Sequence, residues 1–219
     1  MKKILFIIDK IELKYFEFNN LVTNFWLIKE FLERGNEVFI TTIPNLSLKR
    51  DRAYTKCFET FTSENNIFYK DSKLEKEIDS FDLVMFRPDP PVDIDYINAT
   101  YIFDFVTKPQ VINSPKAIRD FNEKLHSVHF KDLMTDNIVT ASLEEIEQFL
   151  ALHKQIVLKP LNRCFGSGVM YLYEGDPNTR TIINTMTNNE NTLVMVQEFI
   201  PAVKKGDKRV LTLGDKVLK

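Results

Sequence analysis

The chain has little cysteine, no excess of charge and no long apolar run. Its two cysteines, Cys57 and Cys164, lie far apart, which excludes a disulfide framework and a zinc-type spacing and is typical of a reducing cytoplasm. Lys and Arg total 29 against 31 Asp and Glu, a net charge of −2, so no basic field predicts binding to nucleic acid or to a membrane surface. No apolar run approaches the roughly 18 residues that a spanning helix needs. We therefore expect a soluble, cytoplasmic protein with small-molecule or protein partners.

The apolar run at the start of the chain is short. Ile4 to Ile8 follows two lysines, as in a signal peptide, but Asp9 ends the run before the usual length of a signal peptide's apolar segment. A continuous β-rich run of this kind is typical of a buried strand. Asp9 directly follows that strand, and its position alone makes it a candidate substrate residue.

Glycine is scarce and unevenly placed. Of the six glycines, only Gly35 precedes position 166. Because glycine permits backbone conformations that other residues avoid, this distribution predicts close-approaching loops in the last quarter of the chain.

The first part of the chain alternates strand and helix patterns. Strands are predicted at residues 4–8, 37–42, 83–86 and 110–112. Helical spacing predicts a helix over residues 19–34 that ends at Gly35. Strand, helix and strand in this order favour an α/β fold with a parallel sheet. The polar stretch 49–80 gives no assignment, and we place a domain boundary near Asp120, giving domains 1–120 and 121–219.

The second part continues with strands and helices. Strands are predicted at residues 138–140, 156–159, 169–173, 194–199 and 209–213. Helices are predicted over 122–131, over 142–153, and from a turn at Gly175-Asp176-Pro177 to about residue 188, with Pro177 at the first helical position. Ser142 and Glu145 form a capping box in which Ser142 bonds an orphan amide and Glu145 reaches back.

Arg87 begins the stiff segment Arg87-Pro88-Asp89-Pro90-Pro91 directly after a predicted buried strand. The carboxyl ends of strands in open α/β sheets are where ligands bind, and a rigid loop could present Arg87 to a carboxylate in a bidentate manner. The alternative is a proline-rich turn in which Arg87 pairs with Asp89.

Lys159 ends an apolar strand and is followed by a loop that contains Gly166, Ser167 and Gly168. A lysine beside exposed loop amides suits a phosphate, although this is no Walker A sequence. The alternative is an edge lysine beside a flexible loop.

Two later segments carry further candidates. Gln197 to Ile200 ends an apolar strand before a proline, where backbone groups could bond an adenine edge; Glu198 could equally be a solvated residue. Gly206-Asp207-Lys208-Arg209 could bind anions or form a simple hairpin. His126 and His129 share a helix face without a visible third ligand, so we assign them a structural role and expect no metal site.

The residues of these segments and their order resemble prokaryotic glutathione synthetase, an ATP-grasp ligase. The resemblance is collinear from Asp82 onward and rests on Arg87-Pro88-Asp89-Pro90-Pro91, Asn113-Ser114-Pro115, Asn122-Glu123-Lys124-Leu125, Ile156-Val157-Leu158-Lys159-Pro160-Leu161, Glu174-Gly175-Asp176-Pro177-Asn178 and Pro201 through Leu211. It implies a Rossmann-like (pre-ATP-grasp) domain with a parallel sheet, followed by an incomplete ATP-grasp domain. The implied reaction joins γ-glutamylcysteine to glycine with ATP through an acyl phosphate, and family members are commonly homo-oligomers.

The resemblance also implies roles for individual residues. Lys124 and Lys159 would contact ATP phosphates, and Arg87 would lie on the γ-glutamylcysteine side. Asp207 would border the nucleotide, and Arg209 would act as the catalytic residue that faces the transferred phosphoryl group. The residues implied to clamp adenine are Gln197, Glu198, Phe199 and Ile200.

The sequence departs from the family in three places, one of which is Lys10, where a proline is usual after Asp9. The resemblance places the Mg²⁺ ligands and the glycine-binding loop in a C-terminal segment that these 219 residues do not include, so we expect the isolated chain to be inactive. Arg163 and Phe165 replace two glycines of the phosphate loop, which restricts its backbone. Three interpretations stay open: an enzyme completed by a separate chain or broken by a frameshift, a non-catalytic remnant, and a nucleotide-binding module.

Overall fold

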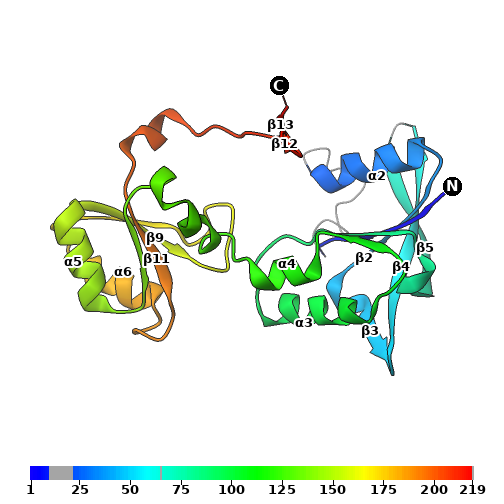
Figure 1. The fold of residues 1–219 in the computed structure, drawn as a ribbon, viewed down its shortest axis with the longest axis horizontal. Helices are drawn as coiled ribbons and strands as arrows, with labels where there is room; N and C mark the ends of the chain where they lie inside the picture. Colours follow the sequence, from blue (N-terminus) through cyan, green and yellow to red (C-terminus); the bar gives the residue numbers. More distant parts are fainter. Residues whose placement is uncertain (10–21, 65, 219) are drawn as a thin grey trace. The chain divides into compact units, whose positions relative to one another are not determined.

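The computed structural model describes residues 1–9, 22–64 and 66–218. Contacts group the chain into two compact units, residues 1–122 with 162–165 and residues 123–161 with 166–219 (Figure 1). Within the described residues, no helix is both long and apolar enough to cross a membrane.

The first unit is built on a mixed sheet with the strand order β3-β4-β2-β1-β6-β7, with β5 paired to β4. Its strands are β1 Lys3–Ile7, β2 Glu37–Thr41, β3 Leu46–Lys49, β4 Arg52–Ser63, β5 Asn66–Glu77, β6 Leu83–Phe86 and β7 Gln110–Ile112. Its α-helices are α2 Thr23–Glu33, α3 Ile94–Ile102 and α4 Pro115–Asp120. Short 3-10 turns lie at Ile43–Asn45, Ile78–Ser80 and Phe103–Phe105.

The predicted α/β class is confirmed. The predicted parallel pairing holds for four of these strands. β1 pairs in parallel with β2 and β6, and β6 pairs in parallel with β7. The polar stretch without an assignment forms β4, β5 and the turn Ile78–Ser80, and β4 pairs antiparallel with both β5 and β3. These strands escaped the sequence pattern because much of β5 is exposed and carries charged residues, as suits the edge of a sheet.

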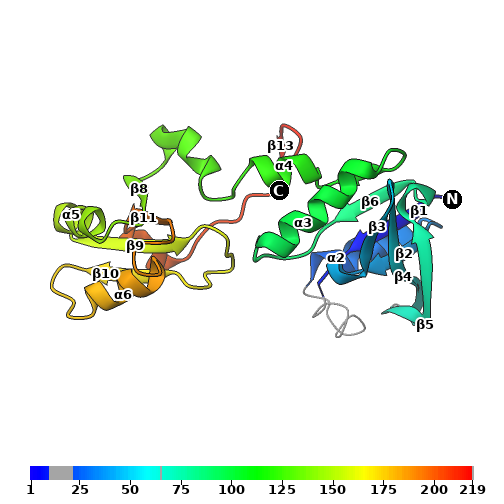
Figure 2. The ribbon, with the colours of Figure 1, turned by 90° about the horizontal axis from the view of Figure 1, so that it is seen from below.

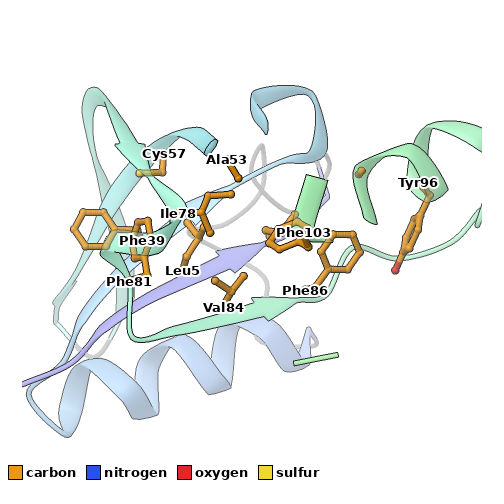
Figure 3. Packing of buried hydrophobic residues seen from close by; sticks show 12 residues of the cluster. Leu5, Phe39, Ala53, Cys57, Ile78, Phe81, Val84, Phe86, Tyr96 and Phe103 are labelled. Atoms are coloured by element: carbon orange, nitrogen blue, oxygen red, sulfur yellow. The ribbon is translucent and has the colours of Figure 1, made fainter. Parts of the chain in front are cut away.

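Helices α2 and α3 cover opposite faces of this sheet (Figure 2), and alternation along the central strands buries both faces. Even-numbered residues of β1 such as Phe6 pack with Phe25 and Ile28 of α2. Odd-numbered residues pack on the other face with α3, and Figure 3 shows Leu5 and Val84 between two aromatic pairs. These pairs are Phe39 with Phe81, at 5.5 Å between ring centroids, and Phe86 with Phe103, at 5.3 Å.

The helix predicted over residues 122–131 is wrong. Helix α4 ends at Asp120 because Phe121 is extended, and a turn leads into a 3-10 helix, η5, at His126–Leu133. The hydroxyl of Ser127 donates to the carbonyl of Lys124, a local bond that competes with α-helix formation. None of the η5 residues is buried, so no core packing enforces a regular helix.

The second unit has a four-stranded antiparallel sheet with the order β10-β9-β11-β8. Its remaining elements are β8 Asn137–Thr140, α5 Leu143–His153, β9 Gln155–Pro160, β10 Met170–Tyr173, α6 Thr179–Met186, β11 Val194–Glu198, the 3-10 helix η6 Pro201–Lys205, β12 Thr212–Leu213 and β13 Lys216–Val217. Helices α5 and α6 pack on one face of the sheet through buried residues such as Phe149 and Ile183.

Beyond η5, two elements of this unit differ from the prediction by more than one residue at a boundary. Helix α6 begins at Thr179, two residues after Pro177, because the Asp176 carboxylate accepts a hydrogen bond from the Asn178 amide at 2.8 Å and holds a turn before the helix. The strand predicted at residues 209–213 is only the two-residue β12, paired with β13.

Candidate functional site

Helices α5 and α6 cover one face of the sheet in the second unit, and the candidate residues lie on the opposite face. Ile156 and Leu158 of β9 are buried against the helices, so the alternating residues Val157 and Lys159 lie on the opposite face. On β11, Gln197 pairs with Val157 in the antiparallel register, and on β10 Tyr171 does so from the other side. Polar and aromatic side chains therefore form a row across this second face.

Lys159 is the cation on that face. Its ammonium group donates to Oε1 of Gln197 at 2.6 Å. Burial lowers the pKa of Lys159, and the positive charge of Lys124 lowers this pKa further. A partly desolvated cation gains more from an anionic ligand than an exposed one does.

Lys124 brings a second positive charge to the same place. It lies in the turn before η5, and its effect on the Lys159 pKa means that the two ammonium groups interact. The Lys124 carbonyl is fixed by Ser127, whose amide donates to it at 3.3 Å. Two like charges held together suit a ligand with several negative charges, such as a polyphosphate.

Aromatic rings lie beside this row. The Tyr171 ring packs against Phe199 at 4.7 Å between centroids and against Tyr173 at 6.2 Å. Tyr171 is 44% exposed, so part of its ring is available to a flat ligand. Sequence reasoning missed Tyr171, although the apolar and aromatic alternation of β10 could have placed it opposite Leu172.

The predicted hinge Gln197 to Ile200 has most of its backbone donors in use. The backbone amide of Glu198 donates to the Asp136 carbonyl at 3.0 Å, and the amide of Phe199 donates to the Gln155 carbonyl at 3.1 Å. The amide of Ile200 has no acceptor among residues 1–9, 22–64 and 66–218. Ile200 is thus the backbone donor of this segment that a ligand could use.

Asp207 and Arg209 are not brought to Lys159. Both side chains are exposed in the irregular segment between η6 and β12. Neither makes a hydrogen bond or an ion pair within the described part of the chain.

The loop after Lys159 keeps a left-handed backbone where the resemblance implies glycine. Phe165 has φ +54°, and Gly166 and Gly168 have φ +70° and +73°. The Phe165 side chain is 82% exposed. The backbone at Phe165 is therefore restricted, because a non-glycine residue adopts this left-handed conformation at a cost of about 1–2 kcal/mol.

In the first unit, Asp9 lines a cavity of about 320 Å³ at the carboxyl end of the parallel strands. The cavity is lined by Ile8, Asp9, Thr42, Ile43, Pro44, Pro88, Asp89, Pro91, Asp93, Asp95 and Tyr96. The Asp9 carboxylate accepts a hydrogen bond from the Asp89 amide at 2.6 Å. Burial raises the pKa of Asp9 against the lowering effect of this bond, and the Asp89 charge raises it further.

Arg87 does not line this cavity, although the neighbouring residues Pro88 and Asp89 do. Its Nε donates to Oδ1 of Asn24, on α2, at 2.5 Å, and Arg87 is not among the cavity-lining residues. An Arg87–Asp89 ion pair is absent from the described residues, so the alternative of a self-paired proline turn is wrong. The structure does not place Arg87 and Asp9 in one pocket.

The two histidines lie close together. The rings of His126 and His129 are 5.1 Å apart. Across the described ranges, no group of three or more His, Cys, Asp or Glu side chains is arranged to hold a metal ion.

Solved structures define the class of fold. The chain superposes on a D-alanyl-alanine synthetase A from Vibrio cholerae with a TM-score of 0.59 and 12% identity, covering 99% of this chain and 65% of that one. It superposes on a RimK domain protein ATP-grasp from Sphaerobacter thermophilus with a TM-score of 0.56 and 17% identity, covering 91% and 64%. The fold is that of ATP-grasp ligases.

Sequence comparison defines the family within that class. The profile of the prokaryotic glutathione synthetase N-terminal domain matches residues 2–119, and that of the ATP-grasp domain matches residues 123–219. The chain therefore belongs to the prokaryotic glutathione synthetase family, as its motifs predicted.

Curated relatives agree with this assignment. A glutathione synthetase of Buchnera aphidicola subsp. Schizaphis graminum is 34% identical over 89% of this chain and 62% of its own length. One from Vibrio parahaemolyticus is 34% identical over 87% and 62%, and one from Neisseria meningitidis serogroup B is 32% identical over 100% and 70%. The chain thus spans less than two thirds of the length of the first two relatives.

Proposed function

We propose that the second unit binds ATP on the sheet face that carries Lys159. The observation that supports this most strongly is the half-buried Lys159, whose ammonium group donates to Oε1 of Gln197 at 2.6 Å on this face, with the charge of Lys124 acting on it as well. Their charges would meet the phosphates. Pairing with anionic oxygens would offset the desolvation that lowers the Lys159 pKa.

The adenine ring would lie beside Tyr171 and Phe199. Stacking on an aromatic ring suits a base, and the Ile200 amide and the carbonyls of Gln197 to Phe199 would bond its polar edge. Gln197 would have two roles. Its backbone carbonyl would bond the adenine edge, and its side chain accepts the hydrogen bond from Lys159. Asp207 and Arg209 would join the site only when ligand binding brings their segment to Lys159, with Asp207 against the nucleotide and Arg209 at the transferred phosphoryl group.

The reaction proposed for the whole enzyme is the family's: ATP-dependent joining of γ-glutamylcysteine to glycine. ATP would supply the phosphoryl group that activates the cysteinyl carboxylate as an acyl phosphate, which the glycine amine then attacks. Arg87 and Asp9 would act on the γ-glutamylcysteine side, in the first unit. Neither Cys57 nor Cys164 forms a disulfide, which supports a reducing, cytoplasmic setting.

The described residues do not fit Mg²⁺, since no cluster of metal-ligating side chains occurs among them. We propose that its ligands and the glycine pocket come from residues outside these 219, either continuous with them or on a second chain. The 219-residue chain alone would then bind nucleotide without catalysing ligation, because developing phosphoryl charge would lack its metal.

Glutathione formation measured by mass spectrometry tests this proposal. The 219-residue chain is incubated with ATP, Mg²⁺, γ-glutamylcysteine and glycine, and nucleotide retention is measured in the same sample. We expect retained nucleotide and no glutathione. Glutathione formed by the chain alone would overturn the proposed inactivity, and no retained nucleotide would overturn the proposed ATP site.

A second candidate, a remnant without ligand binding, is favoured by one observation. Phe165 adopts a left-handed conformation in the loop that should fold over the phosphates. If this residue has ended nucleotide binding, Phe165→Gly should restore it. If the wild-type chain already binds, the remnant interpretation is wrong.

A further inference from the structure

Asn24 is a buried polar residue in an otherwise apolar setting. It lies in the first turn of α2, only 5% exposed, next to Phe25, which packs into the core with Ile28. Burying an amide without good hydrogen bonds costs about 1–3 kcal/mol, so the contacts of Asn24 should explain its presence.

Asn24 contacts Arg87 twice. Its Oδ1 accepts from Nε of Arg87 at 2.5 Å, and its Nδ2 donates to the Arg87 carbonyl at 3.3 Å. The Arg87 amide donates to the carbonyl of Ile7 at 3.0 Å. The side chain and the backbone of Arg87 are therefore both held where β6 ends.

This clamp leaves one side of the guanidinium for a ligand. With Nε engaged by Asn24, the Nη1 and Nη2 groups remain, and neither bonds to an acceptor in the described ranges. Two parallel N–H groups of this kind match the two oxygens of a carboxylate. An arginine that is already fixed loses less conformational entropy when it binds a ligand.

We infer that Asn24 is a positioning residue that holds Arg87 with both Nη groups directed to a carboxylate of the substrate. This inference rests on the proposed function, in which Arg87 binds γ-glutamylcysteine. It assigns a role to a residue on α2, 63 positions away from Arg87, which no motif indicated.

The test is a double-mutant cycle on the full 219-residue chain, with γ-glutamylcysteine as the titrated probe. Asn24→Ala should weaken its binding about tenfold, since one or two bonds to a charged group are lost. In an Arg87→Ala background, Asn24→Ala should have no further effect on the affinity. A purely structural role would lower stability in both backgrounds without this dependence on Arg87.

Asn36→Ala is the matched control. Asn36 also makes two hydrogen bonds in the first unit, from its Nδ2 to the Phe31 carbonyl at 2.9 Å and from the Lys2 amide to its Oδ1 at 3.1 Å. We expect this variant to lose stability and to keep its affinity for γ-glutamylcysteine. Asn24→Asp, which keeps the acceptor oxygen, serves if Asn24→Ala does not fold; its charge competes for Arg87 and should also weaken binding about tenfold or more.

The outcomes separate the two proposals. A wild-type chain that does not bind γ-glutamylcysteine overturns the proposed substrate site, and this inference with it. A wild-type chain that binds, together with a variant at Asn24 that binds equally well, overturns the inference alone. An Asn24→Ala effect that persists without Arg87 also overturns it.

Discussion

The position of Lys159 disfavours its charge in the free protein and favours the binding of an anion. Its ammonium group is partly buried and close to Lys124, and both effects lower its pKa in the free protein. The same features make it a strong partner for phosphate oxygens. A residue of this kind lowers the folding stability of the free protein and raises its affinity for a ligand, as residues of binding sites often do.

Lys159→Met should make the protein more stable and a poorer nucleotide binder. The folded state disfavours the charged lysine, so removing the charge at neutral pH should raise the free energy of unfolding, by up to about 1 kcal/mol since solvent screens a half-exposed group. Thermal unfolding with and without ADP measures both effects. A variant that is less stable and binds ADP as well as wild type would contradict the proposed role.

The pH dependence of ADP binding follows from the same lowered pKa. At the proposed site Lys159 would bind phosphate only when protonated, so ADP affinity should fall as the pH rises through the folded-state pKa of Lys159. Because that pKa lies below the ordinary 10.5, the fall should begin at a lower pH than an unperturbed lysine would give. Titrations over a pH series measure this, and an affinity that is flat up to the ordinary lysine range would contradict it.

The two cysteines should differ in reactivity. Cys57 is fully buried, and burial raises its thiol pKa to about 11, whereas Cys164 is partly exposed. Because the thiolate is the reactive form, a thiol reagent at pH 8 should label Cys164 in the native chain and Cys57 only after unfolding. Cys164→Ser should abolish native labelling. Rapid native labelling of Cys57 would contradict the described burial.

Helix α5 begins with a cap that differs from the predicted box. Ser142 accepts from the Glu145 amide at 3.3 Å, as expected. Glu145 does not reach back to the Ser142 amide; that amide donates to the Thr140 hydroxyl at 3.0 Å, and the same hydroxyl donates to Glu145. Thr140 therefore links the two halves of the box.

Ser142→Ala should destabilise the second unit by about 1 kcal/mol, because an orphan amide of α5 loses its acceptor. Urea unfolding followed by circular dichroism measures the change. Ser167→Ala, which alters an exposed serine of the same unit, should leave the unfolding midpoint unchanged. Equal effects of the two substitutions would mean that the cap contributes nothing.

Short runs rich in apolar residues were predictable, and elements whose apolar residues lie among polar ones were not. β6 and β7 were predicted with the observed bounds because runs such as Leu83–Phe86 are apolar throughout. β4 and β5 were missed since their exposed faces carry charges, and α3 was missed because its apolar residues lie among polar ones. The η5 residues have no buried face, so local bonds decided their conformation.

The candidate site could be predicted only in part. Lys159 and Gln197 were found from motifs, but their mutual hydrogen bond depends on the pairing of β9 with β11. Asn24 could not be found from sequence, since its significance arises when α2 packs beside the end of β6. Motifs identify residues, and the pairing of distant elements determines what they contact.

The molecule has two units with separate cores, which allows ligand effects to be assigned. The single tryptophan, Trp26, lies on α2 in the first unit. A ligand that binds only the second unit stabilises that unit by about 2.7 kcal/mol at a hundred times its dissociation constant. ADP should therefore raise a calorimetric transition and leave the tryptophan-detected transition in place. Equal shifts of both would contradict nucleotide binding to the second unit alone.

Calorimetric titration of ATP without Mg²⁺ into the 219-residue chain tests nucleotide binding at Lys159. The wild-type chain and Lys154→Met, which removes an exposed lysine of the same unit paired with Glu174, should bind one ATP with similar affinity. Lys159→Met should bind at least about tenfold more weakly. A wild-type chain that gives no heat of binding, or a Lys159→Met variant that binds as tightly as wild type, would contradict an ATP site built on this lysine.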